Sequence, residues 1–304
     1  MMDVMISALI CTRNRADYLR RAIRSLVDQT LPQDCYEIIV VDNASEDATA
    51  DVIREFGDVP TLRSIYEPVL GLSRARNTAW QNARGIYVAY LDDDAVACRQ
   101  WLESYLEVFQ WSKPTPGSVG GKCEPIWEAP QPDWLADQML TSLSVYDWSD
   151  TPITLDEDQW ISGCNIAFPV QVLKEMGGFR EDLGRKGKKL LSGEETYLRR
   201  QLDAHGYQTV YDPKITVGHH ISPQRLNKPW FRQHAYGTGQ SAAVMLKAES
   251  TVPAGRRINL SVRKMLWTAP RAAMMLVGRH PADRFRREYQ VLETLGYLHG
   301  LWST

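Results

Sequence analysis

The sequence IYVAYLDDD, residues 86–94, joins a short apolar run to three consecutive aspartates. An apolar run of this length, ended abruptly by charge, indicates a buried strand. Upstream of it, apolar runs and helical patterns alternate along the chain at residues 4–11, 19–27, 36–41, 45–56, 62–66 and 73–83. Strands that alternate with helices predict an α/β fold with a mainly parallel central sheet that is flanked by helices.

Two polar residues stand where helix N-caps are needed. Asn14 precedes the first helical pattern and Ser45 precedes the second, so each is expected to cap a helix. The middle of the chain, roughly residues 112–165, is rich in Pro, Gly and Trp. This composition predicts loops that shape a binding surface.

Composition excludes several classes of protein. The chain has 304 residues, of which 44% are hydrophobic and 24% are charged, as in a soluble globular protein and unlike a disordered chain, a collagen or a coiled coil. The five cysteines form no C-x-x-C pair, which speaks against a disulfide framework or a zinc site and favours a reducing cytoplasm. The apolar N-terminus lacks a preceding basic segment, so it predicts a strand and not a signal peptide. No apolar run reaches the ~18 residues of a membrane span.

The near-neutral total charge hides an uneven distribution. Residues 223–304 hold thirteen basic and four acidic side chains, a net charge of +9, whereas the rest of the chain carries −11. Beyond Trp230 the sequence is helical in pattern, and Pro253 and Pro281 predict breaks that divide it into three helices. We therefore expect a basic helical extension over 223–304 with a partner of its own.

Polar side chains stand at the carboxyl ends of three predicted strands, the edge at which open α/β sheets bind ligands. They are Thr12-Arg13-Asn14, Asp42-Asn43 and Asp92-Asp93-Asp94. Because side chains alternate along an extended segment, Asp92 and Asp94 are expected to face one site while Asp93 points elsewhere. Two close carboxylates repel unless a cation lies with them, which predicts a divalent ion. The alternative is an acidic cluster that caps the helix starting near Arg99.

Several motifs, in order, make the chain resemble glycosyltransferase family 2 from about Ile6 to Arg225. They are VMISALICTRNRADYLRRAIRSLVDQT, EIIVVDNASEDAT, GLSRARNTAW, GIYVAYLDDDA, ISGCNIAFP, MGGFRE, SGEETYLRR and VGHHISPQRL. Members of this family have the GT-A fold, and their strand-end D-x-D binds a divalent ion and the sugar nucleotide. The resemblance implies a GT-A catalytic domain over 1–222, with a nucleotide-sugar-binding part over 1–122 and an acceptor-binding part over 123–222.

Carried over residue by residue, the resemblance places a nucleotide sugar at the strand ends. The implied donor contacts are Thr12, Arg13, Asp42, Arg76, Asn77, Asp92 and Asp93. The implied metal ligands are Asp94, Asp92 and His219, with Asp94 as the direct one. Taken singly, Thr12 and Asp42 have the alternative of turn formers, and Arg76 has that of a solvated helix charge.

Two further pairs of residues complete the implied site. His219 and His220 follow a predicted strand, so they point to opposite sides and one of them is expected to be a ligand. Glu194 and Glu195 precede a predicted helix, where acidic residues often only complement the helix dipole. The family has its catalytic base here, most often an Asp at the second acidic position, so the resemblance implies Glu195 as the base. Glu194 and Trp160 are candidate acceptor contacts.

Residues 180–192, with the sequence REDLGRKGKKLLS, precede that acidic pair. Two glycines and four basic side chains from Gly184 to Lys189 predict a mobile lid that closes over substrate. The alternative is a solvated surface loop.

The predicted function is metal-dependent, inverting transfer of a sugar from a nucleoside-diphosphate donor. The donor expected first is a UDP-sugar, the metal Mn²⁺ or Mg²⁺, and the acceptor a hydroxyl of a glycan, a polysaccharide or a lipid-linked sugar. One alternative, a sugar-1-phosphate nucleotidyltransferase, requires a glycine-rich loop that residues 11–15 lack. Another is a non-catalytic scaffold, against which the intact acids argue. No nucleic-acid motif accompanies the basic residues, so nucleic acid is not an expected partner.

The basic extension contains an amphipathic pattern over residues 256–279. Apolar residues from Ile258 to Leu266 share one helical face, with Trp267 near its edge, which favours peripheral contact with an anionic membrane at its inner face. The alternative is that these helices pack on the catalytic domain, or on a second copy of the chain in a homodimer. Pro270 is expected to interrupt the helix.

Overall fold

The computed structural model describes residues 4–185, 192–249, 251–277 and 281–303, without the side chains of 275–277. The chain divides into two compact units. Unit 1 comprises Met1–Ile126, Ser144–Asp182 and Glu194–His220. Unit 2 comprises Trp127–Leu143, Leu183–Gly193 and Ile221–Thr304. The basic extension therefore falls into unit 2, together with two segments that precede it in the sequence.

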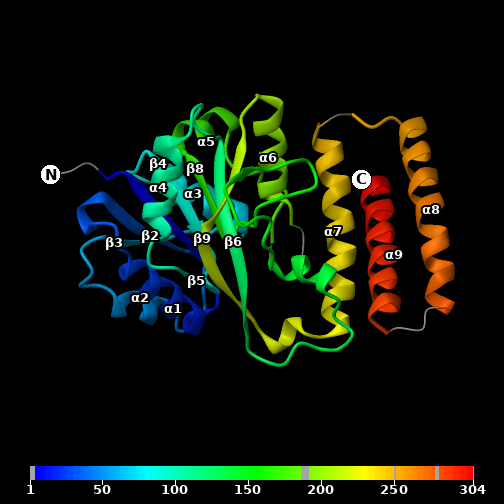
Figure 1. Ribbon diagram of the computed structural model, residues 1–304, viewed down its shortest axis with the longest axis horizontal. Helices are drawn as coiled ribbons and strands as arrows, with labels where there is room; N and C mark the ends of the chain where they lie inside the picture. Colours follow the sequence, from blue (N-terminus) through cyan, green and yellow to red (C-terminus); the bar gives the residue numbers. More distant parts are fainter. Residues whose placement is uncertain (1–3, 186–191, 250, 278–280, 304) are drawn as a thin grey trace. The chain divides into compact units, whose positions relative to one another are not determined.

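A nine-stranded sheet in the described residues forms the frame of unit 1, in the order β3-β2-β1-β4-β8-β6-β9-β5 with β7 paired to β9 (Figure 1). The strands are β1 (Ile6–Thr12), β2 (Tyr36–Asp42), β3 (Leu62–Tyr66), β4 (Tyr87–Leu91), β5 (Ala95–Ala97), β6 (Ser118–Trp127), β7 (Ile153–Thr154), β8 (Asn165–Pro169) and β9 (Thr209–Ile221). From β3 to β4 the neighbours are parallel, whereas β8 is antiparallel to β4 and to β6. The α/β fold is confirmed, and its sheet is parallel only where helices connect the strands, because parallel neighbours need such crossovers.

The helices of unit 1 pack on this sheet. They are α1 (Ala16–Val27), α2 (Thr49–Glu55), α3 (Leu72–Gln81), α4 (Trp101–Trp111), α5 (Val170–Met176) and α6 (Glu194–Ala204), and a 3-10 turn η1 spans Gln33–Cys35. In α1 the apolar residues Leu19, Ile23 and Leu26 recur on one face and are fully buried. That face packs toward β5 and α2, while α3 packs on β1 and β2.

Neither predicted N-cap forms. Asn14 adopts a left-handed φ of 54°, and its Oδ1 accepts a hydrogen bond of 2.7 Å from the Glu46 amide. Ser45 Oγ accepts a hydrogen bond of 3.0 Å from the Asn14 amide, and the N-cap of α2 is Ala48. The two predicted caps instead join the β1–α1 loop to the β2–α2 loop, because both loops leave the same edge of the sheet.

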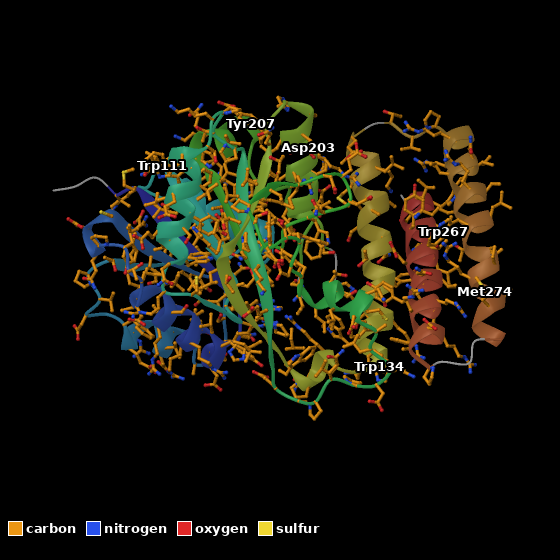
Figure 2. All side chains as sticks on the ribbon, viewed as in Figure 1. Trp111, Trp134, Asp203, Tyr207, Trp267 and Met274 are labelled. Atoms are coloured by element: carbon orange, nitrogen blue, oxygen red, sulfur yellow. The ribbon has the colours of Figure 1, made fainter. Side chains whose placement is uncertain are left out.

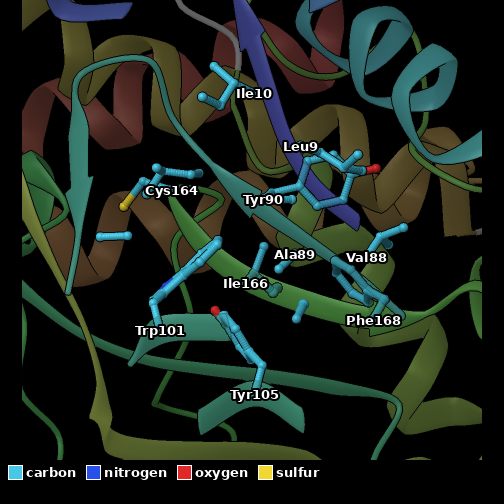
Figure 3. Packing of buried hydrophobic residues seen from close by; sticks show 14 of the residues in the cluster. Leu9, Ile10, Val88, Ala89, Tyr90, Trp101, Tyr105, Cys164, Ile166 and Phe168 are labelled. Carbon is cyan, nitrogen blue, oxygen red and sulfur yellow. The ribbon is translucent and has the colours of Figure 1, made fainter. Parts of the chain in front are cut away.

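A buried asparagine organises the core between the sheet and α4. Figure 3 shows its two aromatic partners on α4, Trp101 and Tyr105, among the buried hydrophobic residues. Asn165 Oδ1 accepts hydrogen bonds of 2.8 Å from the Trp101 indole and 2.9 Å from the Tyr105 hydroxyl. Asn165 Nδ2 donates to the carbonyl oxygens of Lys122 and Ile215, at 3.0 and 2.9 Å. One amide thereby satisfies the polar groups of two buried aromatic residues and links α4 to β6 and β9.

Three long helices dominate unit 2, and α9 lies between the other two (Figure 1). They are α7 (Lys228–Glu249), α8 (Ala254–Val277) and α9 (Pro281–Trp302), and two 3-10 turns, η2 (Asp137–Leu143) and η3 (Pro223–Arg225), precede them. The three predicted helices are confirmed. The expected interruption at Pro270 is wrong, because α8 continues through it. Pro270 is exposed, so the carbonyl that it leaves unpaired reaches water.

Glycines allow α7 and α9 to approach closely. A Cβ atom on Gly239 would lie 1.9 Å from the carbonyl oxygen of Glu293, and one on Gly296 would lie 2.0 Å from that of Tyr236. Both obstructing atoms belong to backbone, so neither can move aside as a flexible side chain would. Among the described residues, no helix has both the length and the hydropathy needed to cross a membrane.

Candidate functional site

Three strand ends meet at one edge of the sheet in unit 1. Thr12 at the end of β1 is paired in register with Asp42 at the end of β2. The neighbouring strand β4 ends at Leu91, directly before Asp92. Because parallel neighbours share their carboxyl edge, these predicted donor contacts lie along one line.

Arg15 lies between two of the three strand-end aspartates. Its Nη1 donates to Asp93 Oδ1 at 3.2 Å and also to Asp94 Oδ2. Thr12 Oγ1 donates to Asp93 Oδ2 at 2.8 Å. Burial raises the pKa of the Asp93 carboxyl, and the positive charge of Arg15 opposes that rise. Thr12 at the end of β1 thus supplies a hydroxyl, and Arg15 in the loop after it supplies a cation, and these two groups hold the aspartates in place.

The expected alternation of the three aspartates is wrong. Asp93 shares Arg15 with Asp94, whereas Asp92 Oδ1 accepts a hydrogen bond of 3.3 Å from Arg76 Nη2. The reason is that β4 ends at Leu91, so residues 92–94 lie outside the strand and the two-residue period no longer applies. These contacts also disfavour the helix-capping alternative, because the aspartates are bound to arginines and not to the start of α4.

The two histidines of β9 do alternate as expected. His219 Nε2 lies 3.2 Å from Asp94 Oδ1. His220 faces the other way, toward α1, where its ring lies 5.5 Å from that of Tyr18 and 3.4 Å from Arg21 Nη1. His219 reaches Asp94 because β9 pairs with β5 at this point, with Ala95 opposite His219.

Arg76 of α3 is the centre of a second buried ion cluster. Its Nη1 donates to Glu194 Oε1 at 2.6 Å and lies 3.9 Å from Glu195 Oε2. Its Nη2 contacts Asp92, as described above. The Arg76 side chain is 3% exposed, which excludes the alternative of a solvated helix charge. One guanidinium therefore connects a strand-end aspartate to the two carboxylates at the start of α6.

Aromatic rings and a glycine enclose this guanidinium. Arg76 Cζ lies 5.9 Å from the ring centre of Tyr90 and 5.5 Å from that of Phe179. The Tyr90 hydroxyl donates to the Arg76 carbonyl oxygen at 2.9 Å. A Cβ atom on Gly163 would lie 2.2 Å from Arg76 Nη2, so only glycine leaves room for the guanidinium there. These contacts restrict Arg76 to a single position among the carboxylates.

Glu194 and Glu195 have different environments. Glu194 is bound directly by Arg76, whereas Glu195 is farther from it. The Oε2 atoms of both are buried and have no hydrogen-bond partner within the described residues. Burial raises the pKa of the Glu195 carboxyl, and the nearby charge of Glu194 raises it further. Burial and the neighbouring charge thus make Glu195 a better proton acceptor than a solvent-exposed glutamate.

Asn77, a predicted donor contact, is bound to the protein itself. Its Oδ1 accepts hydrogen bonds of 2.8 Å from the Phe179 amide and 3.1 Å from the Trp80 indole. Its Nδ2 donates to the Phe179 carbonyl oxygen at 2.8 Å. Asn77 thus fixes the backbone of the residue whose ring covers Arg76.

In the part of the chain that the structure describes, the side-chain contacts of the remaining predicted residues do not connect them to the two ion clusters. Asp42 Oδ1 accepts a hydrogen bond of 2.9 Å from the Ser45 amide, which agrees with its turn-forming alternative. Arg13 is half-buried, and its Nε has no partner among the residues that the structure describes. The ring of Trp160 lies 4.9 Å from that of Tyr146, and its carbonyl accepts a hydrogen bond of 2.7 Å from the Trp148 indole. Of the predicted lid, which runs from Gly184 to Lys189 within residues 180–192, positions 186–191 lie outside the described residues.

Sequence reasoning missed two residues of the site, Arg15 and Gly163. Arg15 follows Arg13 in the loop after β1, and its role follows once β1 and β4 are known to be neighbours. Gly163 lies in the turn before β8, and its role became visible only with the structure, which brings Arg76 of α3 against it.

Asp94 and His219 form a pair that fits a divalent metal ion. Their side chains are almost fully buried and their oxygen and nitrogen atoms converge to 3.2 Å. A carboxylate oxygen and an imidazole nitrogen are both ligands that Mn²⁺ accepts. No group of three or more His, Cys, Asp or Glu side chains is arranged to hold an ion within the described residues. The pair could therefore supply two ligands to such an ion.

Comparisons of the sequence with known proteins point to one family. The model of glycosyl transferase family 2 matches residues 7–174. A glucosyl-dolichyl phosphate glucuronosyltransferase of Haloferax volcanii is 25% identical over 244 residues, 79% of this chain and 77% of that protein. Glycosyltransferase AglE of the same organism is 29% identical over 79% of this chain and 74% of its own length.

Solved structures show the same fold. A mannosyltransferase from Pyrobaculum calidifontis, PcManGT, in complex with GDP-Man and Mn²⁺, aligns with a TM-score of 0.66 at 19% identity over 99% of this chain and 88% of that one. TarS of S. aureus in complex with UDP aligns with a TM-score of 0.55 at 17% identity, over 98% of this chain and 90% of that one. The fold is thus of GT-A type. Since the family model spans more than half of the chain and includes the strand-end carboxylates, the chain belongs to glycosyltransferase family 2.

Proposed function

We propose that the chain transfers a sugar from a nucleoside-diphosphate sugar to a hydroxyl acceptor with inversion at the anomeric carbon. The observation that carries this proposal is the ion cluster of Arg76. A single buried guanidinium holds Asp92, at the donor-binding edge, and the Glu194–Glu195 pair, at the start of α6. Fixed placement of donor-binding groups next to a base is what a one-step displacement requires.

Glu195 is proposed as the base. It takes the proton of the acceptor hydroxyl while that oxygen forms a bond to the anomeric carbon. The bond from this carbon to the diphosphate oxygen breaks, and the nucleoside diphosphate leaves on the opposite face, so the configuration inverts. Glu195 suits this role because Arg76 binds Glu194 more directly, and because its raised pKa strengthens it as a proton acceptor.

Asp94 and His219 are the residues proposed to hold Mn²⁺ or Mg²⁺, and Asp92, which binds Arg76 in this structure, is the third proposed ligand. Such an ion, when bound, neutralises charge on the departing diphosphate. Arg15 keeps Asp93 and Asp94 in position for this purpose.

The nucleotide is proposed to lie along the strand ends. Thr12, Arg13 and Asp42 stand where its base and ribose would be bound. We assign Asn77 a positioning role, because its amide is bound to the backbone of Phe179.

The proposed donor is a UDP-sugar. TarS, one of the proteins with this fold, was solved with UDP and with UDP-GlcNAc, whereas PcManGT was solved with GDP-Man. The proposed acceptor is a sugar linked to a lipid phosphate, since the name of the glucuronosyltransferase relative states such an acceptor. Trp160 and the neighbouring Trp148 are proposed to contact that sugar through their apolar rings.

Thermal unfolding with a panel of nucleotides tests donor and metal together. UDP with Mn²⁺ is expected to raise Tm by several degrees, since a ligand at ~100 times its Kd adds about 2.7 kcal/mol of stability. EDTA should abolish most of this rise. A larger rise with GDP, dTDP or CMP would contradict the choice of base, and a rise that EDTA leaves intact would contradict the metal.

Turnover is tested with UDP-sugars and a sugar-phosphoprenol acceptor, by measuring release of UDP and the anomeric configuration of the product. We expect UDP release that depends on the acceptor, and an inverted product. A retained configuration would refute the single displacement. No release with any donor would favour the non-catalytic scaffold.

A further inference from the structure

Helix α8 packs against α9 mainly with polar residues, and Leu260 is the large apolar residue that it adds to the cluster around Tyr297 and Leu301. Ser261 and Thr268 are the buried polar residues of α8, at 8% and 7% exposure. Thr268 Oγ1 lies 2.8 Å from Thr294 Oγ1 of α9, and Ser261 Oγ accepts a hydrogen bond of 3.0 Å from the Trp302 indole. Lys264 Nζ lies 5.2 Å from the ring centre of Tyr297 on α9. The helix therefore turns hydroxyl and ammonium groups toward its own protein.

The apolar side of α8 faces solvent. Its large apolar residues are Leu266 at 70% exposure, Ile258 at 55%, Met265 at 50%, and Val262, Trp267 and Met274 at 44% each. Figure 2 shows Trp267 and Met274 on this helix. Surface helices of soluble proteins have the opposite orientation, with the apolar stripe toward the core. An exposed apolar stripe along a whole helix marks a surface that contacts something outside the chain.

The charges of α8 identify what covers this face. The helix carries five basic residues and no acidic one between Ala254 and Val277. Arg271 lies over the ring of Trp267, with its Cζ 3.5 Å from the ring centre, and Lys264 lies 5.7 Å from the same ring. An amphipathic aromatic side chain next to cations, at the edge of an apolar stripe, suits the boundary between acyl chains and anionic headgroups.

We propose that α8 is a docking helix that lies along an anionic phospholipid surface, with its apolar face inserted among the acyl chains and its basic side chains at the phosphates. A second copy of the chain fits less well, because two such helices would bring like charges together. The proposal rests on the geometry of α8 and not on the proposed transfer reaction, so either can fail while the other stands.

Flotation of the full-length protein with lipid vesicles tests the proposal. We expect binding to vesicles of phosphatidylcholine mixed with phosphatidylglycerol and not to vesicles of phosphatidylcholine alone, and weaker binding at higher salt. The variant Ile258→Glu/Leu266→Glu should bind at least ~10-fold more weakly, because it places two charges in the apolar face. Arg263→Gln should lose about fivefold, as expected for one cation near an anionic surface. Trp111→Glu is the matched control, since Trp111 is exposed on α4 in unit 1, and it should bind normally.

The same variants distinguish a lipid surface from a protein partner at this helix. Absence of binding to both vesicle types, or unchanged binding of Ile258→Glu/Leu266→Glu, would overturn the proposal. So would an intact protein that sediments as a dimer, becomes a monomer in that variant and ignores vesicles. Both substituted residues are exposed, so Tm should be unchanged. If the double variant unfolds, Leu266→Ser replaces it, and the same loss of binding is required.

Discussion

Glu194 and Glu195 are adjacent residues that Arg76 binds differently, and this difference predicts different consequences of substitution. Glu195→Gln keeps the size of the side chain but cannot accept a proton. We expect kcat to fall by ~10²–10⁴-fold, the usual contribution of a general base. The affinity for UDP should stay nearly unchanged, because the role is confined to the transition state. Steady-state kinetics and calorimetric titration with UDP measure the two quantities.

Glu194→Gln is the paired variant, and it should act chiefly on stability. It removes the carboxylate that Arg76 binds at 2.6 Å inside the protein. Loss of one partner of a buried ion pair costs on the order of 3 kcal/mol, which a denaturant titration detects. If instead Glu194→Gln lost kcat and Glu195→Gln lost stability, the assignment of the base would be reversed.

Asp94 contacts both Arg15 and His219, and the metal proposal depends on it. Asp94→Asn preserves the shape of the side chain but removes its charge. We expect Mn²⁺ to lose its effect on UDP affinity, while weak metal-independent binding remains. Asp17→Asn, at a side chain that is 87% exposed on α1, is the control and should behave as the unsubstituted protein. Metal-dependent UDP binding of normal strength in Asp94→Asn would contradict the assignment.

Among the structural elements, the close contact between α7 and α9 predicts a sharp effect of added volume. Gly296→Ala would place a methyl group 2.0 Å from a backbone oxygen of α7, so the helices must separate. We expect a loss of about 1–3 kcal/mol in the free energy of unfolding, as for other overpacked interiors. Gly255→Ala in α8 is the control, because nothing lies within 4 Å of its new Cβ. Chemical denaturation should show it neutral or slightly stabilised, and equal losses in both variants would contradict the close approach.

His234 on α7 predicts how the stability of unit 2 depends on pH. Burial lowers the pKa of His234 from 6.5 to about 4, with the charges of Arg185 and Arg225 acting in the same direction. Below pH 6.5 the unfolded chain therefore takes up a proton that the folded chain does not. The contribution of neutral His234 to the free energy of unfolding is therefore fully present above that pH and is lost as the pH falls toward 4. The expected loss between pH 7 and pH 5 is about 2 kcal/mol.

Urea titrations at the two pH values measure this decline. His234→Gln should remove most of it, although the variant also loses the 2.8 Å contact of His234 Nδ1 with the Tyr289 hydroxyl at both pH values. His205→Gln, at an exposed position on the C-terminal side of α6, should leave the decline unchanged. A decline that persists in full in His234→Gln would show that another group is responsible.

Sequence periodicity predicted strands well where the strand is buried, because burial requires apolar side chains along it. β1 and β2 are buried along nearly their whole length, so their apolar runs were unambiguous. Alternation also held at His219 and His220, which lie inside β9. It failed at Asp92–Asp94 because the strand ends one residue earlier, and a strand end is decided by tertiary contacts that a periodic pattern does not contain.

At the scale of the whole molecule, the sequence periodicity identified the apolar face of α8. It could not tell whether this face contacts the rest of the protein or faces solvent. An amphipathic pattern defines two sides of a helix, and only the packed structure decides which side meets the protein. The role of Arg15 was not predicted for a similar reason, because its partners Asp93 and Asp94 lie 78 and 79 residues away in the sequence. Pairings between distant loops follow from strand order, which the alternation of strands and helices left undetermined.

The shared guanidinium of Arg76 also constrains how this protein can change over generations. Three carboxylates from two segments more than a hundred residues apart depend on one cation, and Gly163 leaves that cation its space. A substitution at one of the carboxylates changes the charge around Arg76, and one at Gly163 takes away its space, so a descendant must keep the cluster intact or replace several members together. Diversification should therefore proceed in the segments around the cluster, while Arg76, its three carboxylates Asp92, Glu194 and Glu195, and Gly163 are inherited together.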